Sequence, residues 1–177
     1  IAMSDTAVAQ GSTTVLYALS SIIGIVLMIF GIYTFYDSLD ESQKKHPFLR
    51  FGTFVLVISF LMFIMTIPND LSMIFGAKEN AKNIMSIEFG VIMAGGIILF
   101  AGLAFMALGM SMLSILNIMF TRFVALFSII LIIAHIYTAM NFTGDADSLM
   151  PMFAGVSIAQ IVMLVFFVLM GKQMMED

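Results

Sequence analysis

The stretch "VIMAGGIILFAGLAFMALGMSML", Val91 to Leu113, is a continuous apolar run without a single charged side chain. About 20 such residues, wound as an α-helix, cross the hydrocarbon of a bilayer. Backbone groups in hydrocarbon must bond within their own segment, and the run shows none of the alternation of a lipid-facing barrel strand. We therefore predict a membrane-spanning helix here, extending over residues 89–116.

Four further apolar runs of comparable length flank this one. They cover residues 15–36, 51–67, 123–140 and 152–171. The chain of 177 residues is 62% hydrophobic and 10% charged, which lies outside the range of soluble domains. These features predict an all-α fold, an integral membrane bundle of about five hydrophobic helices in a single domain over residues 1–177. Four spans remain an alternative, because the second run has about the minimum spanning length. Residues 117–122 leave room only for a tight helical hairpin.

Small residues recur at every seventh position in three of these runs. Glycine weakens a helix unless the missing side chain lets another backbone come close, and a period of seven keeps the small residues on one helix face. The pattern predicts helix-helix packing at Gly24, Gly31, Gly52, Ser59, Gly95, Gly102 and Gly109. It does not decide whether the facing helix belongs to the same chain or to another copy.

The positions of the basic residues predict an orientation in the membrane. Five of the seven fall on one side of the five-span arrangement, namely Lys44, Lys45, Arg50, Arg122 and Lys172. Basic loops tend to stay in the cytoplasm, so the N-terminus is expected outside and the C-terminus inside. A chain that opens at Ile1 rather than at methionine also suggests that a segment such as a leader peptide preceded it.

Two of the connections between the spans carry recognisable local signals. In the first, Asp40 and Glu41 stand four residues before Lys44 and Lys45, an order that favours a helical turn, and Pro47 is expected to end that turn. This loop is either a topology signal or part of a polar surface shared by several copies. In the second, Asn69 or Asp70 is a candidate helix cap before an amphipathic piece over 71–81, expected along the outer interface.

Candidate catalytic groups are sparse. No serine nucleophile with a base, no paired carboxylates and no phosphate-binding loop appear, and the chain has no cysteine. The two histidines, His46 and His135, fall on opposite sides of the membrane and cannot share a metal within one chain. We therefore predict no enzyme activity and no metal site. His135 and Gln160 are the intramembrane polar residues, and they either hydrogen-bond each other or serve a transport path.

The first third of the chain carries a resemblance to a known family. The segment "LYALSSIIGIVLMIFGIYTFYDSLDESQKKHPFLRFGTFVLVISFLMFIMTIP", residues 16–68, has a first helix with Gly and Ser that ends in "YTFYD", a short basic loop with a proline, and a second helix that closes at Pro68. It resembles the two-helix hairpin of small membrane proteins in conjugative type IV secretion systems of the Dot/Icm and IncI-plasmid type. Those proteins in turn resemble conjugative pilins.

The resemblance implies a subunit of the bacterial inner membrane that is extracted into a pilus. Its partners would be copies of itself, other secretion-system subunits and phospholipid packed between the helices. The loop would face the filament lumen, where Lys44, Lys45 and Arg50 would meet transported DNA or protein. Two other functions stay open, an accessory multipass subunit of another membrane complex and a small transporter or channel.

Overall fold

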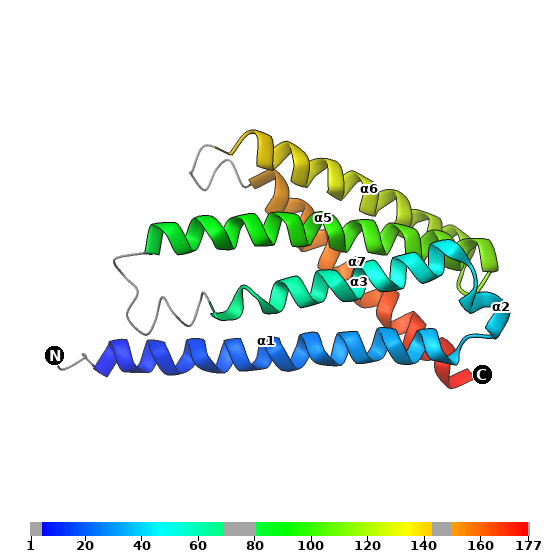
Figure 1. The fold of residues 1–177 in the computed structure, drawn as a ribbon, viewed down its shortest axis with the longest axis horizontal. Helices are drawn as coiled ribbons and strands as arrows, with labels where there is room; N and C mark the ends of the chain where they lie inside the picture. The colour runs from blue at the N-terminus through cyan, green and yellow to red at the C-terminus, as the bar shows by residue number, and fades with distance from the viewer. Residues whose placement is uncertain (1–4, 69–80, 143–149, 177) are drawn as a thin grey trace.

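The computed structural model describes residues 5–68, 81–142 and 150–176. Within these ranges the chain forms only helices, which run roughly lengthwise through an elongated bundle (Figure 1). The elements in chain order are α1 (Asp5–Ser38), α2 (Glu41–Lys44), α3 (Pro47–Ile64), α5 (Ala81–Leu113), α6 (Ile118–Met140) and α7 (Met150–Glu176).

Five of these helices are long and apolar enough to cross a membrane. Their spanning parts are Val15–Ser38, Pro47–Ile64, Phe89–Leu113, Ile118–Met140 and Gly155–Met175. The prediction of an all-α bundle with about five hydrophobic helices is therefore confirmed, and these helices indicate a membrane location. The amphipathic piece predicted over 71–81, with its cap at Asn69 or Asp70, falls almost wholly outside the described residues.

Local chemistry moves several predicted boundaries. The second span starts at Pro47 rather than residue 51, because proline is preorganised for the first helical position and needs no hydrogen-bond donor there. The fourth span starts at Ile118 rather than residue 123, because the Asn117 side chain caps the helix by accepting a hydrogen bond of 3.0 Å from the Phe120 backbone. Arg122 therefore belongs to α6 and not to the hairpin.

The α5–α6 hairpin turns at Ser114, which has a φ of 56°. The Ile115 N–H donates to the Met110 carbonyl at 3.1 Å, and the Ser114 N–H donates to the Ser111 carbonyl at 3.4 Å. This pair of bonds is the Schellman arrangement, in which the left-handed position is usually glycine. A serine therefore occupies the strained position that ends α5.

Replacing Ser114 by glycine should raise the free energy of unfolding by about 0.5–1 kcal/mol, because glycine adopts a positive φ without steric cost. Valine at the same position should lower it, since a β-branched side chain is the least tolerant of this conformation. Unfolding in denaturing detergent, followed by circular dichroism, measures both changes. Equal stability of the glycine and valine variants would contradict the strained turn.

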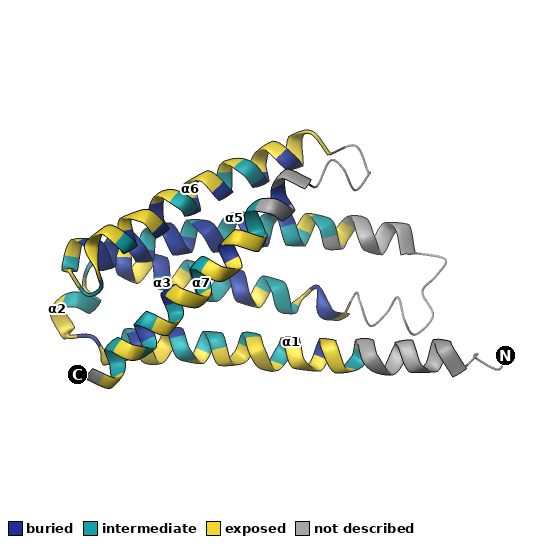
Figure 2. Cartoon of the chain, turned by 180° about the vertical axis from the view of Figure 1, so that it is seen from behind, coloured by how far each residue is buried: buried dark blue, intermediate teal, exposed yellow. Residues whose placement is uncertain are grey.

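Helix α5 is the centre of the bundle. Of the residues in its most apolar window, 56% are buried, against 11% for α1, and Figure 2 shows the same contrast as dark blue on α5 and yellow along α1. Leu103, Met106 and Met110 of α5 are almost completely buried, together with Leu49 and Leu56 of α3. The core thus lies where α3 and α6 pack against the two sides of α5.

Helix α7 crosses the bundle diagonally. It runs from the end of α6 behind α5 and α3 to the end of α1 (Figure 1), and the view from behind shows it passing across the other helices (Figure 2). It contacts α6 and α1 accordingly. Helix α1 lies at the edge, with Leu27, Phe30 and Tyr33 more than half exposed.

Candidate functional site

The glycines of α3 and α5 form a tight seam between these two helices. A Cβ added to Gly102 would lie 2.7 Å from the Leu56 backbone nitrogen, and one added to Gly109 would lie 2.7 Å from the Leu49 nitrogen. A Cβ on Gly52 would overlap the Met106 backbone. Real Cβ atoms do not come so close to backbone atoms, so the two helices can approach only because these side chains are missing.

The two remaining packing positions predicted on α3 and α5 are Ser59 and Gly95. Ser59 is completely buried and donates a hydrogen bond of 2.6 Å to the Leu56 carbonyl of its own helix. A Cβ on Gly95 would lie 3.4 Å from the Phe63 ring, which is normal van der Waals distance. The question that the sequence left open is answered here, because the facing helix belongs to the same chain.

The glycines of α1 are different. A Cβ added to Gly24 or to Gly31 would meet no atom of the described residues within 4 Å, and the same holds for Gly171 on α7. Gly31 and Gly171 also line a cavity of about 90 Å³ between α1 and α7, beside the buried Ile32. The predicted packing positions on α1 are thus open within one chain.

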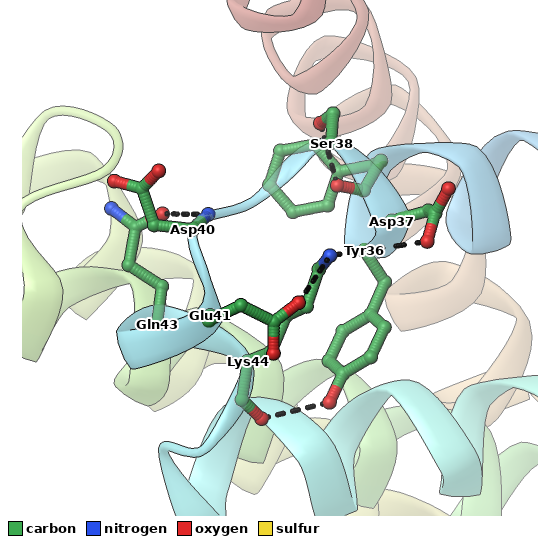
Figure 3. Close-up of polar contacts among 8 residues, drawn as sticks. Tyr36, Asp37, Ser38, Asp40, Glu41, Gln43 and Lys44 are labelled. Atoms are coloured by element: carbon green, nitrogen blue, oxygen red, sulfur yellow. Dashed lines mark hydrogen bonds and ion pairs between the residues drawn. The ribbon is translucent and has the colours of Figure 1, made fainter.

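The charged loop is organised around Lys44 (Figure 3). The Lys44 ammonium lies 3.3 Å from the Glu41 carboxylate on α2 and 3.9 Å from the Asp37 carboxylate on α1. The Tyr36 hydroxyl donates a hydrogen bond of 2.8 Å to the Lys44 carbonyl. Lys44 is therefore tied both to the end of α1 and to its own turn α2, and its side chain is only 22% exposed.

The helical turn predicted in this loop is confirmed as α2, but its details differ. Gln43 accepts a hydrogen bond of 3.1 Å from the Asp40 N–H, and Asp40 caps the turn from the other side. Lys44 pairs with Glu41 three residues before it, and the turn ends at Lys44, so Pro47 does not terminate it. Pro47 begins α3 instead.

The other two bases of the loop point elsewhere. Lys45 and Arg50 are exposed and line a groove of about 500 Å³ with Pro47, Phe51 and Phe54. Among the described side chains, neither base lies within 4 Å of a carboxylate. The three bases that the sequence grouped therefore separate into one paired lysine and two open cations.

The basic residues assigned to one side gather at one end of the bundle. Lys44 and Lys45 lie in and beside α2, Arg50 and Arg122 fall near the starts of α3 and α6, and Lys172 falls near the end of α7. These helix ends lie together in Figure 1. His46, just before α3, is at this end too, whereas α6 carries His135 near the opposite end, as predicted.

His135 and Gln160 line the same cavity, of about 240 Å³, where α3, α5, α6 and α7 meet. His135 is 2% exposed and Gln160 is exposed. The ring of His135 uses Nδ1 for a hydrogen bond of 2.8 Å with the Leu131 carbonyl rather than with Gln160. The structure therefore brings the two intramembrane polar residues to one place, but His135 is anchored to its own helix.

Sequence reasoning missed Gly96, which creates the space for the His135 ring. A Cβ on Gly96 would lie 2.6 Å from Nε2 of His135, so only glycine leaves room for the imidazole against α5. The neighbouring Phe100 meets the same ring edge to face, with centroids 5.2 Å apart. The paired glycines at 95 and 96 are a visible signal, but the seven-residue spacing directed attention to the first of them alone.

Sequence reasoning also missed two contacts beside the charged end of the bundle. Phe105 of α5 packs against Phe48 and Phe51 of α3, with ring centroids 5.8 and 5.0 Å apart. Arg122 Nε donates a hydrogen bond of 3.3 Å to the Ser111 hydroxyl across the α5–α6 hairpin. Both contacts depend on the register between helices, which single runs of sequence do not reveal.

Comparison with known proteins finds no matching family model, no similar curated protein and no similar solved structure.

Proposed function

We propose that this chain is a structural, self-assembling membrane subunit of a conjugative type IV secretion system, working through helix packing and not through catalysis. The observation that carries the proposal is the contrast between two sets of glycines with the same seven-residue spacing. Beside the glycines of α3 and α5, the space for a Cβ is occupied by a neighbouring helix. A Cβ added to Gly24 or Gly31 would meet no described atom within 4 Å. Since glycine costs helix stability, an open glycine face is best explained by a partner helix from another copy.

The form of assembly that we propose follows from the resemblance of residues 16–68 to the pilin-like hairpin. Copies would pack along α1 into a pilus with phospholipid between them. The excess of basic residues at one end of the bundle favours the cytoplasmic side for that end. Before extraction, the chain would span the bacterial inner membrane with its N-terminus outside and its C-terminus in the cytoplasm. The open cations Lys45 and Arg50 would then face transported DNA or protein, while Lys44 holds the loop in shape.

Electron microscopy of native material, combined with mass spectrometry of its protein and lipid, tests this proposal. Filaments composed mainly of this chain with stoichiometric phospholipid are expected. Discrete particles in which the chain is a minor component would overturn the pilus, and would identify an accessory subunit of another membrane complex.

Reversing the open cations, with Lys45→Glu and Arg50→Glu together, should reduce cargo transfer at least tenfold while leaving the folded amount unchanged. Both side chains are exposed, so their loss removes few native contacts, whereas the added acids repel nucleic acid. Transfer frequency and membrane abundance, measured in the same cells, separate the two effects. Lys172→Glu is the control for an added acid at the same end of the bundle, and an equal loss in that variant would contradict a specific role.

A further inference from the structure

The cavity beside His135 presents a hydrogen-bond acceptor inside the membrane-spanning region. A backbone carbonyl can only accept, so the bond between Nδ1 and the Leu131 carbonyl places the proton of the neutral ring on Nδ1. Nε2 is then an acceptor. None of the described side chains donates a hydrogen bond to Nε2, although His135 is only 2% exposed. Nε2 is therefore available to accept a hydrogen bond from a ligand in the cavity that the ring lines.

The walls of the cavity are apolar and partly aromatic. They are formed by Phe63, Ile92, Gly96, Leu99, Phe100, Met152, Val156 and Met163, in addition to His135 and Gln160. A few convergent polar groups within an apolar lining are typical of small-molecule sites. Among the residues that the structure describes, no ionised side chain lines this cavity, so an uncharged ligand fits it better than an ion.

The size of the cavity limits the ligand. At about 240 Å³ it is larger than the cavities of about 150 Å³ that hold one benzene ring. It is smaller than the pockets of about 300–1,000 Å³ that hold drug-sized molecules. One or two fused rings match this volume, and the two phenylalanines in the lining, Phe63 and Phe100, favour an aromatic ligand.

We propose that this cavity binds an uncharged aromatic alcohol, a phenol- or quinol-type ring, whose hydroxyl donates a hydrogen bond to Nε2 of His135. Gln160 supplies the second polar contact from α7, since its amide can donate or accept. Its exposed position leaves the cavity open toward the surroundings of the bundle, so the ligand enters from the lipid. The site is built within one chain and does not depend on the proposed assembly.

The test uses 1-naphthol and 1-methoxynaphthalene, which share a ring system but differ in the hydroxyl donor. The chain has no tryptophan, so naphthol emission is measured on a low protein background, in detergent, with the full-length protein. Naphthol should bind about tenfold more tightly than the methyl ether, because only naphthol satisfies Nε2. With only two histidines, a ring-¹⁵N-labelled protein should show a shift of the His135 Nε2 signal while the His46 signals stay in place.

Two variants complete the test. His135→Phe should lose the preference for naphthol over its ether, whereas Val156→Phe should lose both ligands, because it fills the cavity from α7 without changing His135. Subtracting the Val156→Phe signal also removes partition into the detergent. Equal affinity of the two probes for the native chain, an unmoved His135 signal, or undiminished naphthol binding by Val156→Phe would each overturn the proposal. The comparison of the two probes needs no variant, so it holds even where His135→Phe fails to fold.

Discussion

Gly52→Ala should lower the free energy of unfolding by about 3 kcal/mol or more, the largest effect expected of a single methyl group in this chain. The added Cβ would overlap the Met106 backbone, and backbone atoms cannot turn aside as a side chain can. Helices α3 and α5 would have to separate, which loosens the packing around Leu56 and Leu103 at the centre of the core. Unfolding in denaturing detergent measures the loss.

The matched control for this prediction is Gly24→Ala. The same methyl group on α1 meets no atom within 4 Å, and alanine is the better helix former by about 1 kcal/mol. The stability of this variant in the unassembled chain should therefore be unchanged or slightly higher. Similar losses in both variants would show that the α3–α5 seam is not the feature that distinguishes them.

Gly24→Leu combined with Gly31→Leu should weaken self-association at least tenfold and leave the folded chain intact. The leucine at position 24 would occupy the open face of α1, so a second helix could no longer approach it closely. The leucine at position 31 would enter the cavity of about 90 Å³ that α1 shares with α7, where a Cβ meets nothing within 4 Å. A single cysteine in place of Leu27, which is 64% exposed on this helix, reports the contact as a disulfide between copies, since the native chain has no cysteine. The disulfide should form in the native background and disappear in the double variant.

Gly90→Leu serves as the control for that experiment. Gly90 also has nothing within 4 Å of its added Cβ, but it lies on α5 near the opposite end from the charged loop. Self-association should survive this change. Unaltered disulfide formation in the Gly24 and Gly31 double variant would contradict assembly along α1, and a loss of folded protein would show that these glycines support the single chain.

Apolar length made the five spanning helices predictable, because the bilayer demands a fixed number of residues whatever the protein does. The ends were less predictable. Pro47 and Asn117 carry recognisable start signals that a hydropathy scan does not weigh, and Ser114 stops α5 where glycine would have been the expected signal. The helical turn in the charged loop followed from its acids and bases, but the choice of Glu41 and Asp37 as partners of Lys44 depends on how α1 meets α2.

The candidate sites were harder to predict, since the same residue type has different roles at different positions. Gly24 and Gly102 have the same spacing in their spans, yet one faces open space and the other the backbone of Leu56. Nothing in a single run of sequence distinguishes them, because the difference depends on which helices become neighbours. His135 and Gln160 were identified as intramembrane polar residues, but the anchoring of His135 on Leu131 and the role of Gly96 required the packed helices.

The diagonal path of α7 has a consequence for biosynthesis. Met152, Val156, Gln160 and Met163 supply one wall of the His135 cavity, and they lie on α7, which leaves the ribosome after α3, α5 and α6. Until that helix inserts, the imidazole has only part of its enclosure. The cavity therefore forms only after α7 has been synthesised, and a nascent chain that stops after α6 has no such site.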